Sequence, residues 1–172
     1  CQMIATCHQA RRNVLIFRSQ PEGYPAFGNP PRANRRIDVW WGGLQANGGL
    51  MLILAYLLRT SGRWRNADIY LNLVVANDQA QAAAERNLEN LVKGLRIGAI
   101  PKVIVAGDRA FDDILKTTSQ HADLVFLGLA TPDETFTEYY LDLQKRTACL
   151  PPTVLVLASE DLEFAEVLQK DG

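Results

Sequence analysis

The sequence has 172 residues, enough for one large domain with a sizeable hydrophobic core. Hydrophobic residues make up 48% and charged residues 22%, which is ordinary globular usage and excludes disordered, collagen-like and coiled-coil chains. The longest apolar run, Leu50–Leu58, is about half as long as the roughly 18 residues of a membrane-spanning helix, so we expect no such span. Because the chain starts at Cys1, we expect a piece of a longer protein.

The net charge of -1 hides an uneven distribution. Residues 1–65 hold nine arginines and only two acidic residues, Glu22 and Asp38, whereas residues 66–172 hold nine basic and seventeen acidic residues. Such polarity either steers the docking of a partner or an anionic surface, or reflects drift in composition along a folded chain.

The first 35 residues contain few regular elements. The pattern predicts a helix over Gln2–Ala10, a strand over Val14–Phe17 and a loop from Gln20 to Ala33 that holds four prolines. We therefore divide the chain into residues 1–19, a Pro/Gly-rich linker over residues 20–35, and a domain over residues 36–172.

From Arg36 onward, apolar runs of strand length alternate with stretches of helical period. Continuous apolar strands are typical of a parallel sheet covered by helices on both faces. The pattern predicts a doubly wound, mainly parallel α/β fold. The expected strands are Ile37–Trp41, Ile69–Val75, Lys102–Ala106, Leu124–Leu129 and Val154–Leu157, and the expected helices are Gly48–Thr60 after an Asn47 N-cap, Gln79–Leu95 after Asp78, Ala110–His121 and Glu134–Cys149.

The first strand has a counterpart near the end of the chain. Asn13–Ser19 aligns with Thr153–Ser159, 140 residues later, with Val, Leu and Ser identical, and each segment follows a helical stretch. We therefore expect residues 1–19 to be the closing helix and strand of a preceding, similar α/β repeat.

A glycine-rich turn follows the strand Ile37–Trp41 and leads into a helix. Free N–H groups at a helix N-terminus favour anions, so this turn is a candidate anion site. Its spacing is neither that of a dinucleotide fingerprint nor that of a P-loop, and the alternative is a tight turn whose glycines allow close packing. The site residues are Gly42, Gly43, Asn47, Gly48 and Gly49.

No constellation for catalysis or metal binding is found. His8 and His121 lie on different elements without ligands at metal spacing, and no Gly-x-Ser-x-Gly elbow is present. The three cysteines include no Cys-x-x-Cys pair, so we expect free, mostly buried thiols. We predict no cofactor, no metal and no enzymatic activity.

Asp38 stands within an apolar strand beside Trp40. A carboxylate buried there needs a partner, and Arg35, Arg36 and Arg63 are candidates. We expect a buried network that fixes the strand rather than a ligand contact. The arginines are not interleaved with exposed aromatic residues, which argues against nucleic-acid binding.

Three motifs together resemble a known family. Arg36-Ile-Asp-Val-Trp-Trp41, Gly48-Gly-Leu-Met-Leu-Ile-Leu-Ala-Tyr-Leu-Leu-Arg59 and Trp64 followed by Ile69 are similar to the carboxy-terminal cytosolic domain of cation-chloride cotransporters. The resemblance extends to Asn13–Phe17 and, more loosely, to Ala122–Gly128 and the last strand.

This resemblance implies a regulatory and dimerisation domain on the cytoplasmic side of the cell membrane. Its partner would be the membrane part of the same transporter, which couples chloride to sodium and potassium and holds the ion sites. The domain in that family looks like two halves similar to universal stress proteins. The long phosphorylatable insertion of animal members is absent between residues 107 and 122, which favours a prokaryotic type.

Two other classes compete with this interpretation. A universal stress protein that binds ATP would place phosphates near Gly128, where this chain has Asp133 and Glu134, and negative charge opposes a triphosphate. An oxidoreductase with a dinucleotide-binding fold lacks its glycine fingerprint.

Two surfaces are candidates for docking and self-association. Arg11, Arg12, Arg35 and Arg36 would lie exposed on one side, toward the transporter's loops or an anionic lipid surface. The C-terminal segment has an apolar helical stripe, which would pair in a homodimer or fold back on its own sheet. The candidate dimer contacts are Leu162, Phe164, Val167 and Leu168, together with Ala165.

Overall fold

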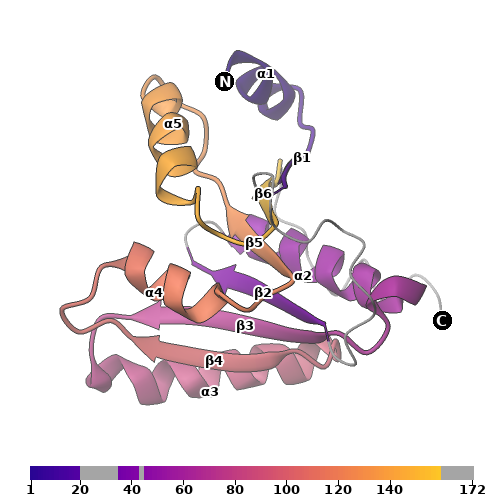
Figure 1. Cartoon of the computed structure of the whole chain (residues 1–172), viewed down its shortest axis with the longest axis vertical. Helices are drawn as coiled ribbons and strands as arrows, with labels where there is room; N and C mark the ends of the chain where they lie inside the picture. Colours follow the sequence, from indigo (N-terminus) through magenta and orange to yellow (C-terminus); the bar gives the residue numbers. More distant parts are fainter. Residues whose placement is uncertain (20–34, 43–44, 160–172) are drawn as a thin grey trace.

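A six-stranded sheet in the order β1-β6-β5-β2-β3-β4 organises the chain (Figure 1). The computed structural model describes residues 1–19, 35–42 and 45–159. Neighbouring strands are parallel, except that β1 pairs antiparallel with β6, so the predicted doubly wound, mainly parallel α/β fold is confirmed. The strands are β1 (Val14–Arg18), β2 (Arg36–Trp41), β3 (Asp68–Val75), β4 (Ile100–Val105), β5 (Leu124–Gly128) and β6 (Thr153–Leu157).

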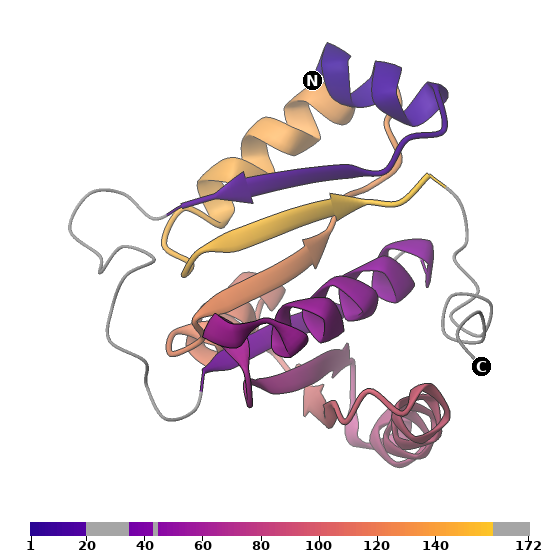
Figure 2. The same cartoon turned by 90° about the vertical axis from the view of Figure 1, so that its right-hand side faces the viewer.

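Helices cover both faces of this sheet, as Figure 2 shows. On one face, α2 and α3 bury the side chains of Ile37, Val39 and Leu71. On the other face, α1, α4 and α5 pack against Trp40, Val125 and other alternate residues. The helices are α1 (Gln2–Gln9), α2 (Gln45–Thr60), α3 (Asp78–Leu95), α4 (Phe111–Ser119) and α5 (Phe136–Arg146), with a 3-10 turn over Gly62–Trp64. Within the described part of the chain, no helix has both the length and the apolar character to cross a bilayer.

Two predicted N-caps were wrong. Helix α2 begins at Gln45, so Asn47 lies in its first turn and is not the N-cap. The N-cap of α3 is Asn77 rather than Asp78, because the Asn77 side chain accepts a hydrogen bond from the N–H of Ala80. Hydrogen bonds from the Asn47 side chain to the backbone after β5 and β6 hold this residue in the first turn of α2.

The edge strand β4 starts at Ile100, two residues before the predicted start at Lys102. Ile100 and Pro101 continue the parallel pairing with Tyr70 and Leu71 of β3. Proline lacks an N–H and is tolerated here because an edge strand needs hydrogen bonds on one side only.

Candidate functional site

The crevice that usually binds ligands in this fold class lies at the carboxyl ends of the parallel strands, where the chain reverses its winding direction. That point lies between β2 and β5, since β3 and β4 extend the sheet on one side of β2, and β5 and β6 on the other. The predicted anion-site residues Gly42, Asn47, Gly48 and Gly49 follow β2 at this end, and Gly43 lies outside the described residues.

Asn47 lies in the crevice between the ends of β2, β5 and β6. Its Nδ2 donates to the carbonyl oxygen of Leu129 at 2.7 Å, just after β5. Its Oδ1 accepts from the N–H of Ala158 at 2.7 Å, just after β6. The residue is 1% exposed. Both polar ends of its amide are hydrogen-bonded, and these two bonds join helix α2 to two strands.

Two glycines allow this close approach. A Cβ atom on Gly48 would lie 2.5 Å from the Trp41 ring, and one on Gly128 would lie 3.0 Å from Asn47 Nδ2. Gly48 and Gly49 are both buried in α2, whereas Gly42 is exposed. This geometry favours the packing alternative for the glycine-rich turn, and anion binding there stays a prediction.

The opposite end of the sheet holds a buried network around Asp38, which is 0% exposed. Arg36 donates from Nε to Oδ1 at 2.7 Å and from Nη2 to Oδ2 at 3.1 Å. Ser119 of α4 donates its hydroxyl to Oδ2 at 2.7 Å and accepts from Trp40 Nε1 at 3.0 Å. Both carboxylate oxygens are therefore satisfied, and the network ties β2 to α4.

Of the three arginines predicted to meet Asp38, Arg36 does so. The Arg36 guanidinium also lies 4.5 Å from the centre of the Tyr70 ring and donates to the carbonyl of Thr118. The Arg35 guanidinium instead lies 4.9 Å from the centre of the Trp64 ring. Ser119 was missed because nothing in the sequence aligns α4 with β2 across 81 residues.

The four predicted docking arginines do not gather on one surface. Arg11 and Arg12 are exposed just before β1, whose first residue pairs with Leu157 at the carboxyl end of β6. Arg35 and Arg36 are half-buried at the start of the central strand β2, so they lie at the opposite end of the parallel strands. Docking through Arg11 and Arg12 stays a prediction, whereas Arg35 and Arg36 stack on aromatic rings of the domain itself.

Helices α4 and α5 are joined by a two-armed ion pair on the surface. Arg146 donates from Nε and Nη2 to the carboxylate of Asp112 at 2.8 and 2.7 Å. These hydrogen bonds are the main reason that the pKa of Asp112 lies below its ordinary value of 3.8 and that the pKa of Arg146 is raised. The pair therefore stabilises the fold only while Asp112 is ionised.

Replacing Asp112 with asparagine is expected to lower the free energy of unfolding by up to about 1 kcal/mol at neutral pH, since the pair is partly exposed. A depressed folded-state pKa gives stability above the unfolded-state pKa, and this stability disappears as the pH falls through the folded-state pKa. Urea unfolding between pH 2 and pH 7 measures the difference in the free energy of unfolding between the Asp112→Asn variant and the unsubstituted protein. The exposed Asp108→Asn is the control. A difference that persists at pH 2 would contradict the assignment.

The remaining predicted features differ in outcome. The cysteines are free, but Cys1 and Cys149 are exposed and Cys7 is half-buried, so the expectation of mostly buried thiols was wrong. Among the described residues, no three His, Cys, Asp or Glu side chains cluster in a way that could hold a metal ion. The candidate dimer contacts Leu162, Phe164, Val167 and Leu168 lie outside the described residues.

Fold and crevice together define a doubly wound α/β domain in which the buried Asn47 joins α2 to the ends of β5 and β6. A family model described as solute carrier family 12 matches residues 25–110, which is half of the chain. The chain belongs to solute carrier family 12.

The structure is also similar to a crystal structure of the cytoplasmic domain of a prokaryotic cation chloride cotransporter, with a TM-score of 0.63. The sequences are 22% identical, and the match covers 96% of this chain. It covers 60% of that domain, so this chain spans less than two thirds of the length of the structure it resembles.

Proposed function

We propose that this chain is a cytoplasmic regulatory and dimerisation domain of a secondary active cation-chloride cotransporter, prokaryotic in type and itself non-catalytic. The observation that carries the proposal is membership of solute carrier family 12 together with the fold of a cotransporter's cytoplasmic domain over 96% of the chain. Its partners are the membrane part of the same transporter, which couples chloride to sodium and potassium, and a second copy of the protein.

The contacts of Asn47 in this crevice support a non-catalytic role and disfavour the nucleotide-binding alternative. A nucleotide at this position would need free N–H groups and space at the ends of β2 and β5. Asn47 occupies that position, with both of its polar ends bonded to the backbone after β5 and β6. The domain therefore acts through its surfaces.

The pairing of β1 with β6 supports the proposal that residues 1–19 close a preceding repeat. If β1 corresponds to β6 with an offset of 140 residues, Val14 corresponds to Val154 and Phe17 to Leu157. In the sheet, Val14 pairs with Leu157 and Phe17 pairs with Val154, so exchanging the two strands maps each pair onto the other. This is the register of two equivalent strands about a local two-fold axis, with residues 20–35 as the linker to the second repeat.

A transport assay on the complete transporter in vesicles tests the proposal. We expect chloride-dependent uptake of a monovalent cation, because the membrane part couples the two ions. Substitution Arg12→Glu, at the exposed turn before β1, is expected to change the rate by about fivefold at equal protein content, the size of a modest coupling between distant sites. The control is Arg86→Glu, an exposed arginine on α3 at the far edge of the sheet.

Two results would contradict the proposal. Uptake that does not depend on chloride would exclude the cotransporter function. Micromolar binding of ATP to the purified chain, measured by calorimetry, would favour the nucleotide-binding module instead.

A further inference from the structure

The sheet has two edge strands, and β4 is the one that lies farthest from residues 1–19 in the strand order (Figure 1). Among the described residues, no strand pairs with the outer side of β4. Its second half consists of Val103, Ile104 and Val105, which are residues of high β-propensity without charge. A strand edge of this composition is a template onto which another chain can add a strand.

A hydrogen bond at the end of β4 shows which of its backbone groups face outward. The N–H of Ala106 donates to the carbonyl oxygen of Val75 in β3 at 2.8 Å, so the backbone groups of Ala106 face the sheet. Successive residues of a strand direct their backbone groups to opposite sides. Val105, Val103 and Pro101 therefore direct their backbone groups away from β3.

The outward residues of β4 differ in what they offer to an added strand. Pairing uses both the N–H and the C=O of a residue, and Pro101 has no N–H. The carbonyl oxygen of Val105 already accepts a hydrogen bond from Nη2 of Arg109 at 2.6 Å. In this described strand, Val103 is therefore the one outward residue that offers both groups, and a ladder needs at least two such residues in a row.

The loop after β4 turns Arg109 back onto the end of the strand. Gly107 has a positive φ of 55°, and the N–H of Arg109 donates to the carbonyl oxygen of Ala106 at 3.1 Å, which closes a tight turn. Nε of Arg109 donates to the same carbonyl oxygen at 3.3 Å. These bonds hold the guanidinium at the edge, although Arg109 is an exposed residue.

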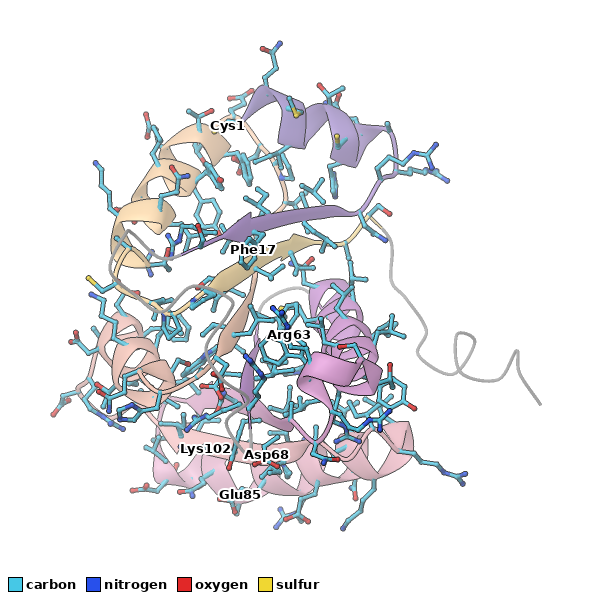
Figure 3. The ribbon with its side chains drawn as sticks, turned by 45° about the vertical axis from the view of Figure 1, so that its right-hand side comes forward. Cys1, Phe17, Arg63, Asp68, Glu85 and Lys102 are labelled. Atoms are coloured by element: carbon cyan, nitrogen blue, oxygen red, sulfur yellow. The ribbon has the colours of Figure 1, made fainter. Side chains whose placement is uncertain are left out.

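Proline and charged side chains are the usual means by which edge strands avoid pairing. At its start, β4 carries Pro101 and the exposed Lys102, which Figure 3 labels. At its end the strand itself has neither proline nor charge, and Arg109 reaches it from the loop. The apolar half of β4 is thus protected from both sides.

We propose that Arg109 prevents the β4 edge from pairing with the same edge of a second copy of this chain. In a two-fold antiparallel pair centred on Ile104, Val103 of one copy would face Val105 of the other. Each of these two positions needs the Val105 carbonyl oxygen that Arg109 occupies. Association of the domain is thereby left to its other surfaces. The inference does not depend on the transport function.

Sedimentation velocity of the purified chain tests this role. For Arg109→Ala, the weight-average mass is expected to rise to about twice that of the unsubstituted protein over a tenfold increase in concentration, because two edges can then pair. Arg86→Ala is the matched control, since it removes the same charge from an exposed arginine on α3. This control is expected to sediment like the unsubstituted protein.

A second variant and a second measurement locate the contact. Arg109→Ala combined with Val105→Pro removes the outward N–H of Val105 and leaves the bonds to β3 in place, so its mass is expected to return to that of the unsubstituted protein. In Arg109→Ala at high concentration, hydrogen exchange at the Val103 amide is expected to slow by at least about tenfold. A role of Arg109 in the turn alone would not change the exchange of Val103.

Three outcomes would overturn the proposal. Equal masses for Arg109→Ala and Arg86→Ala at every concentration would show that Arg109 does not protect the edge. Association that persists when Val105→Pro is added would place the contact on another surface. Association of Arg109→Ala with unchanged exchange at the Val103 amide would likewise exclude pairing through β4.

Discussion

Replacing Asp38 with asparagine is expected to lower the free energy of unfolding by about 3 kcal/mol. The carboxylate accepts hydrogen bonds at both oxygens, from Arg36 at Oδ1 and from Arg36 and Ser119 at Oδ2. An amide offers one acceptor oxygen, so at least one of these donors loses its partner. The Ser119 hydroxyl still accepts from the Trp40 indole N–H, but its own proton competes with Arg36 for the single amide oxygen.

The exposed ion pair between α4 and α5 provides the control for this prediction. Asp112→Asn also removes a two-armed arginine contact, but the Asp112 side chain is 26% exposed, whereas that of Asp38 is 0% exposed. Urea unfolding at pH 7 compares the two variants. A cost for Asp38→Asn within about 1 kcal/mol of that for Asp112→Asn would show that burial does not strengthen the Arg36–Asp38 pair.

The second large effect is expected at Asn47. Substitution with alanine removes the acceptor for the N–H of Ala158 and the donor to the carbonyl of Leu129, both buried at the ends of strands. An unsatisfied buried group costs about 1 to 3 kcal/mol, so we expect a total loss of about 2 to 4 kcal/mol. Alanine is the better helix former, which makes any measured loss a lower limit on the tertiary contribution.

Asn77→Ala is the matched control for Asn47→Ala. Asn77 also uses its side chain to bind a backbone N–H, but it caps α3 at the surface, where the loss of a cap costs about 1 kcal/mol. Equal losses of stability for the two variants, measured by thermal or urea unfolding, would mean that Asn47 does not hold β5 and β6 together.

Asn47 lies at the crevice where this fold class usually binds ligands, and its amide is used in packing. Its two hydrogen bonds hold the backbone after β5 and after β6 to helix α2. The remaining polar networks, around Asp38 and between Arg146 and Asp112, join helices to strands or to each other. These two polar clusters therefore stabilise the packing of helices on the sheet and on each other.

Local sequence determined the class of the fold. Continuous apolar runs such as Ile37–Trp41 and Leu124–Leu129 predict strands buried on both faces, and the helical stretches between them require parallel crossovers. The burial of Asp38 and its contact with Arg36 were also predictable, because a charge within an apolar strand must have a partner, and the nearest arginine is two residues away.

Long-range packing decided what the sequence left open. The helical period does not show that Asn47 enters the first turn of α2, since its side-chain partners are 82 and 111 residues away in the chain. The antiparallel pairing of β1 with β6 and the separation of Arg11 and Arg12 from Arg35 and Arg36 depend on strand order, which composition does not encode. Propensity and period act over a few residues, whereas hydrogen bonds between the ends of distant strands form only once the sheet has brought those ends together.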